Sequence, residues 1–155
     1  METNYKKIDK RRTVCRQQAI IFLEKLAEWS LINEESHGDN EVIRFCEFAK
    51  IVPAAFVCKI AGVIFSPFGD QIENRDYSIF SDEKNIGFID EKLTELIGLE
   101  DLGDETFDFY EILKKEDQTR SPEIQDAFWK RCMICYKAYR LLSEVDDDMP
   151  MYTIP

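Results

Sequence analysis

The chain has 155 residues, of which 45% are hydrophobic and 12% aromatic, and this composition excludes the disordered class and favours one globular domain. Its formal net charge is -11. Residues 1–16 carry six bases and two acids, so the remaining residues hold all of the negative excess. Such a field repels nucleic acid and anionic lipid, so we expect neither a nucleic-acid partner nor a membrane partner.

The cysteine content and the N-terminus point to a cytoplasmic, reducing compartment. The five cysteines are an odd number, and several lie in apolar stretches where a free thiol behaves as a small buried side chain. The N-terminus is charged and lacks the apolar run of a secretory signal. The longest apolar stretch, residues 51–65, is shorter than the ~20 residues of a membrane span, so we expect it to be core.

The first half of the chain predicts three helices after a flexible arm. Residues 1–12 are basic and polar and are expected to form that arm. Thr13 can cap a helix over 13–32, in which Leu23, Leu26 and Ala27 share one face. A loop at 33–40 precedes a helix that ends near Val52, because Pro53 disfavours helical geometry before it. The third helix, 54–65, is apolar nearly all round and should be central.

In the second half of the chain, the sequence pattern predicts secondary structure less clearly, except for the last helix. Residues 66–70 have the composition of a turn, and the alternation at 77–80 suggests a short strand. Short helices are predicted at 90–97 and 104–115. Ser121 as N-cap and Pro122 at the first helical position begin a helix that should reach about Val145.

The remaining residues, 146–155, form an acidic, Pro-containing tail that is expected to be extended. The sequence therefore predicts an all-α, single-domain bundle of about five to seven helices, with a possible strand at 77–80. Its domain would span residues 13–145, between the basic arm and the acidic tail.

Cys132 and Cys135 form a C-x-x-C pair on the last predicted helix, where both sulfurs share a face. Structural zinc usually needs four nitrogen or sulfur ligands, and the remaining candidates are three scattered cysteines and His37. A redox pair needs a helix N-terminus to lower a thiol pKa, whereas this pair lies well inside its helix. We expect two buried small side chains and no metal or cofactor.

Two segments resemble EF-hand calcium loops in part. In residues 82–93, Gly87 and Ile89 stand where the loop glycine and the mid-loop hydrophobe belong, and residues 107–113 are similar to the end of a loop entering its helix. The ligand positions depart from the pattern, with Lys84 and Ile86 in the first segment and Glu105 at the turn of the second. The resemblance implies, as an alternative function, a degenerate EF-hand-like or metal-responsive helical protein.

The sequence carries no phosphate-binding loop, nucleophile elbow or zinc-protease motif, so we expect no enzyme. Asp104, Asp108 and Glu111 share one face of a predicted helix, where an acidic row is usually solvated. Residues 82–126 hold fifteen acids and five bases. The leading prediction is a non-enzymatic protein-binding module, either an inhibitor or immunity-type protein or an accessory subunit of a larger, possibly viral, assembly, that engages a basic protein surface.

Both chain ends leave alternatives open. The basic arm can contact phosphates or fold back on the acidic body, and the tail can dock into a groove on a partner or on its own domain. The residues expected to contact the partner are acids of the 100–111 segment together with two apolar residues of the tail. They are Glu100, Asp101, Asp104, Glu105, Asp108, Glu111, Met151 and Tyr152.

Overall fold

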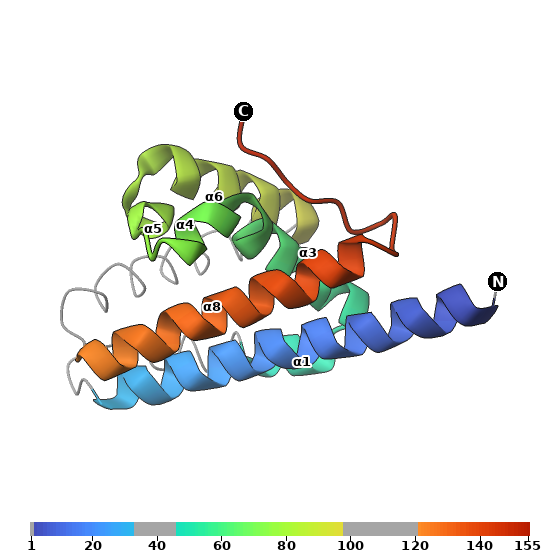
Figure 1. The fold of residues 1–155 in the computed structure, drawn as a ribbon, viewed down its shortest axis with the longest axis horizontal. Helices are drawn as coiled ribbons and strands as arrows, with labels where there is room; N and C mark the ends of the chain where they lie inside the picture. Colours follow the sequence, from blue (N-terminus) through green and yellow to red (C-terminus); the bar gives the residue numbers. More distant parts are fainter. Residues whose placement is uncertain (1, 33–45, 98–120) are drawn as a thin grey trace.

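The computed structural model describes residues 2–32, 46–97 and 121–155, which build an all-α fold (Figure 1). These residues are helical or irregular and contain no strand, so the predicted fold class is confirmed. The long helices α1 (Glu2–Ile32) and α8 (Pro122–Ser143) lie side by side and run antiparallel, with α3 (Ala54–Phe65) packed against both. Helix α6 (Glu83–Ile97) packs against α3 and α5 (Ser78–Ser81), and α4 (Gly69–Glu73) packs against α8 (Figure 1).

Helix α1, Glu2–Ile32, begins eleven residues earlier than the sequence predicted. The expectation of a flexible arm at 1–12 is therefore wrong for residues 2–12, because lysine and arginine favour helix and no breaker interrupts them. Thr13, read as an N-cap, lies inside the helix and donates its hydroxyl to the Asp9 carbonyl oxygen at 2.8 Å. Residues spaced by four and three form the buried row of α1. They are Cys15, Ala19, Phe22, Leu26 and Trp29.

Helix α3, Ala54–Phe65, has the predicted bounds and is buried over most of its length. Pro53 stands at its N-cap position, where the missing proline N–H removes no helical hydrogen bond. The Phe65 ring meets Phe22 of α1 edge to face, with 5.3 Å between ring centroids. Residues 46–51 before it are also helical, whereas the predicted start of that helix lies outside the described residues.

The chain continues as helical turns where the sequence suggested a turn at 66–70 and a strand at 77–80. The 3₁₀ helix η1, Ser66–Phe68, leads into α4, Gly69–Glu73, and α5, Ser78–Ser81, follows. The strand prediction is wrong because four alternating residues cannot distinguish a strand from a helical turn. The Asp76 carboxylate stabilises the start of the helical turn, because its Oδ1 accepts a hydrogen bond from the backbone N–H of Ser78 at 3.0 Å.

Helix α6, Glu83–Ile97, is about twice as long as the predicted helix at 90–97. Asp82 explains the early start, because its Oδ1 accepts the backbone N–H of Lys84 at 2.9 Å, as an N-cap does. Ile89 and Leu93 are buried, and α6 packs against α3 through this face. The helix thereby extends the core that α1, α3 and α8 share.

Helix α8, Pro122–Ser143, starts where the sequence predicted and ends two residues before the predicted Val145. Ser121 caps it by accepting the backbone N–H of Ile124 at 3.3 Å. Its buried row repeats the four-and-three spacing of α1, so the two helices meet along matching stripes. That row consists of Phe128, Cys132, Cys135, Tyr139 and Leu142.

The stretch Ala54–Glu73, which combines α3, η1 and α4, is the one run among the described residues long and apolar enough to cross a membrane. Of its most apolar window, 61% is buried inside the protein. Helices α1, α6 and α8 supply that cover, which is the environment of a core helix.

Candidate functional site

Most of the acids predicted to contact a partner lie outside the described residues. This is true of Glu100, Asp101, Asp104, Glu105, Asp108 and Glu111, and of the predicted helix at 104–115. Two sequence-predicted positions, Met151 and Tyr152, are described. The structure therefore places the tail and leaves the acidic row of this segment a prediction.

The tail is held on the body of the protein, which is the second of the two alternatives for it. The Tyr139 hydroxyl donates to the Pro150 carbonyl oxygen at 2.7 Å, and the Tyr152 N–H donates to Ser66 Oγ at 2.9 Å. Met149 is 1% exposed. Tyr152 is half-buried against the core, and Met151 is 39% exposed, so Met151 is the more accessible of the two.

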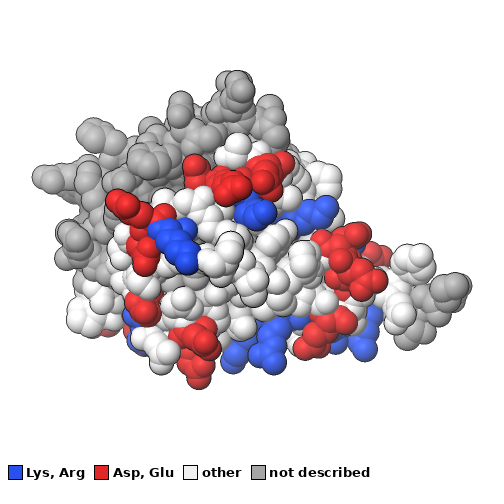
Figure 2. All heavy atoms as spheres, turned by 90° about the horizontal axis from the view of Figure 1, so that it is seen from above, with Lys and Arg blue, Asp and Glu red and all other residues white. Residues whose placement is uncertain are grey.

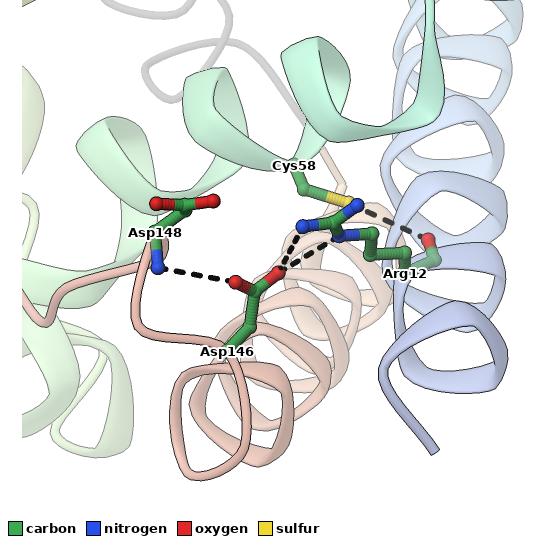
Figure 3. A network of polar contacts seen from close by, with 4 residues as sticks. All are labelled: Arg12, Cys58, Asp146 and Asp148. Atoms are coloured by element: carbon green, nitrogen blue, oxygen red, sulfur yellow. Dashed lines mark hydrogen bonds and ion pairs between the residues drawn. The ribbon is translucent and has the colours of Figure 1, made fainter. Parts of the chain in front are cut away.

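A buried ion pair joins the basic end of α1 to the start of the tail (Figure 3). Arg12 Nε and Nη2 lie 2.8 Å and 2.7 Å from Asp146 Oδ2, and Asp146 is only 4% exposed. The second oxygen, Asp146 Oδ1, accepts the N–H of Asp148 at 3.1 Å. Cys58 donates its thiol to the Arg12 carbonyl oxygen at 3.4 Å. Of the basic segment, Arg12 and also Arg11, which lies 3.5 Å from Glu144, therefore pair with acids of the same chain, while the segment itself continues α1.

Cys132 and Cys135 are both buried in the seam between α1 and α8. Burial raises the pKa of the Cys132 thiol well above its usual value and raises the pKa of Cys135 to about 12. The Cys135 thiol donates to the Gln18 carbonyl oxygen at 3.5 Å. No group of three metal-ligating side chains occurs among the described residues, and His37 lies outside them. Both cysteines therefore act in packing.

The first segment that resembles a calcium loop is mostly helix. Residues 83–93 belong to α6, and Ile89 is buried in its core-facing side. An EF-hand loop must wrap its oxygens around one point, and a regular helix points successive side chains in different directions. The EF-hand interpretation is therefore wrong for this segment, and the second segment lies outside the described residues.

The burial of the thiols predicts that they are unreactive in the folded protein. In the native protein at pH 8, all five cysteines should resist iodoacetamide, because each is buried and the reagent cannot reach its sulfur. Unfolding in urea should expose all five, and intact-mass spectrometry counts the added groups. Rapid native labelling of Cys132 or Cys135 would contradict the packing role.

The same burial sets a pH dependence. An unfolded thiol ionises near pH 9, whereas folded Cys135 keeps its proton until about pH 12. Its contribution to stability is therefore complete below pH 9 and is lost as the pH rises toward 12. Denaturant midpoints measured at rising pH should fall across this window.

A groove between α1 and α8 is the feature that sequence reasoning missed. It has a volume of about 340 Å³ and is lined by both helices near the basic end of α1. Val14 and Leu141 supply exposed apolar surface, at 43% and 49% exposure. Its lining residues are Lys7, Lys10, Arg11, Val14, Ala138 and Leu141.

A second surface feature is an excess of acids on α4, α5 and α6. Residues 70–97 hold eight acids and three bases, and seven of these acids are exposed. Two of the three bases are already paired. Arg75 Nη2 forms an ion pair with Asp126 Oδ1 of α8 at 2.7 Å, and Lys92 Nζ lies 3.5 Å from Glu95 Oε2. We call the seven exposed acids the acidic face. Seen from above, the surface of the protein carries acidic groups with several basic groups between them (Figure 2). The acidic face consists of Asp70, Glu73, Asp76, Asp82, Glu83, Glu91 and Glu95.

No protein-family model, curated protein or solved structure matches this chain. Two surfaces of the described residues could bind a partner, the acidic face on α4–α6 and the α1–α8 groove.

Proposed function

We propose that this protein is a non-enzymatic binding module whose acidic surface engages a basic surface of a protein partner. The observation that carries the proposal is the excess of exposed carboxylates on consecutive elements α4, α5 and α6. The acidic run in the sequence continues beyond α6, through residues 98–126. A field of one sign steers a partner of opposite sign and orients it before contact.

The buried charged groups support a binding role over an acid–base role. Among the described side chains, Asp146 is the most deeply buried charged group, and Arg12 already neutralises it. A carboxylate held by a guanidinium is not free to move protons in a reaction. Asp90 of α6 is half-buried, and its Oδ1 is buried without a hydrogen-bond partner among the described residues. The exposed acids, by contrast, are solvated and can exchange water for the cations of a partner.

The test uses a lysine-rich helical peptide as the basic probe, with affinity measured by fluorescence anisotropy. Binding should weaken by on the order of tenfold between low salt and ~150 mM salt, where the Debye length falls to about 8 Å. A variant that neutralises four exposed acids of α4 and α6 should bind on the order of tenfold more weakly at low salt. Its changes are Glu73→Gln, Glu83→Gln, Glu91→Gln and Glu95→Gln.

The matched control removes the same charge from other exposed positions and should keep nearly full affinity. Its changes are Glu24→Gln, Glu28→Gln, Glu47→Gln and Asp147→Asn. Equal weakening by the two variants would mean that net charge alone attracts the probe, and would remove the argument for a dedicated face. Co-purification of the native protein from its cells, repeated with both variants, then identifies the partner.

A further inference from the structure

The α1–α8 groove carries an inference independent of the acidic face. We propose that it is a docking site for an acidic amphipathic helix of a partner protein. The groove lies between two antiparallel helices (Figure 1), and its volume of about 340 Å³ is within the ~300–1,000 Å³ of binding pockets. A groove between two helices is the shape that receives the apolar face of a third helix.

The apolar part of the groove is exposed rather than filled by this chain. Val14 of α1 and Leu141 of α8 are about half-exposed, while Ala138 between them is small and buried. Burying Val14 and Leu141 under a partner's apolar side chain would remove both from water.

The charged residues of the groove indicate which kind of ligand it would bind. Lys7 and Lys10 are exposed and form no ion pair with any described residue. Arg11 is anchored, because its Nη1 lies 2.6 Å from the Leu141 carbonyl oxygen and 3.5 Å from Glu144 Oε2. This positive rim belongs to a chain of net charge -11, so it attracts local carboxylates while the whole molecule repels long polyanions.

These two parts together select an acidic amphipathic helix over a nucleic acid or a lipid surface. Apolar side chains of such a helix fit over Val14 and Leu141, and its carboxylates reach the ammonium groups of Lys7 and Lys10. A nucleic acid backbone offers no aliphatic side chains for the apolar part. An anionic membrane would have to approach against the net negative charge.

The experiment measures the binding of a labelled peptide with leucine on one helical face and glutamate on the other. The wild-type protein should bind it. Lys7→Glu/Lys10→Glu and Val14→Gln/Leu141→Gln should each bind on the order of tenfold more weakly. These four side chains are exposed, so both double variants should stay folded, which circular dichroism verifies.

Three controls separate the groove from general electrostatics. Lys84→Glu on α6 reverses another exposed lysine and should leave affinity unchanged. A peptide with glutamine in place of leucine should not bind. Anionic phospholipid vesicles and single-stranded DNA should not bind to the same protein.

Failure of the leucine–glutamate peptide to bind, or full binding by either groove variant, overturns the proposal. Preferential binding of vesicles or DNA would also overturn it and assign the lysines to that ligand. Because the acidic-face variants leave the groove intact, this result is independent of the proposed function.

Discussion

Replacing Arg12 with methionine should lower the free energy of unfolding by about 3 kcal/mol, because it leaves the buried Asp146 carboxylate without its counter-charge. The aliphatic stem is kept, so the loss reports the charge rather than the packing. Two guanidinium nitrogens lie within 2.8 Å of one carboxylate oxygen, and the other oxygen bonds to the Asp148 N–H. Urea denaturation followed by circular dichroism measures the change.

Lys25→Met is the matched control for this experiment. Lys25 also lies on α1 and pairs with Glu28 at 3.3 Å, but both side chains are about half-exposed. Exposed pairs contribute at most about 1 kcal/mol, so this variant should stay close to wild type. Combining Arg12→Met with Asp146→Asn should restore stability relative to Arg12→Met alone, since no unpaired charge remains. Equal losses in the Arg12 and Lys25 variants would contradict the structure.

A methyl group at Gly62 should cost about 2 kcal/mol, because the core has no room for it. A Cβ at this position of α3 would overlap the ring of Tyr139 from α8. That ring cannot easily move, since Tyr139 is fully buried and its hydroxyl donates to Pro150 at 2.7 Å. Gly62→Ala should therefore lower the denaturant midpoint, and Gly62→Val should lower it further.

The same glycine-to-alanine change at Gly87 should raise the free energy of unfolding instead of lowering it. Gly87 lies inside α6, and a Cβ there would meet nothing within 4 Å. Alanine favours helix over glycine by about 1 kcal/mol, so this variant should be more stable than wild type. A stabilising Gly62→Ala would show that α3 and α8 lie farther apart than described.

Boundary residues explain which helices the sequence could predict. Pro53 before α3 and the Ser121–Pro122 pair before α8 act on the backbone locally, so these helices start where expected. The start of α1 carries few apolar residues, and Gly87 disfavours helix near the start of α6, so the prediction from hydrophobic spacing placed both starts too late. The Asp82 cap was a local signal for α6 that the prediction did not use.

The candidate site could be predicted less well, because it depends on contacts between distant residues. Charge segregation is a property of the sequence and predicted an acidic surface, but the acids predicted to contact a partner, within 100–111, lie outside the described residues. The α1–α8 groove needs Val14 and Leu141 side by side, although they lie near opposite ends of the chain. The pairing of Arg12 with Asp146 likewise follows only once α1 and α8 are antiparallel.

The thiols in the α1–α8 seam give the protein a built-in reporter of its own motions. Cys135 reaches the backbone of Gln18 on the facing helix, a contact that demands close approach of the two helices. A reagent can reach such a sulfur only when the helices separate. At high reagent concentration, the rate of thiol modification therefore equals the rate of helix separation, and the position of each labelled cysteine tells which part of the bundle opened.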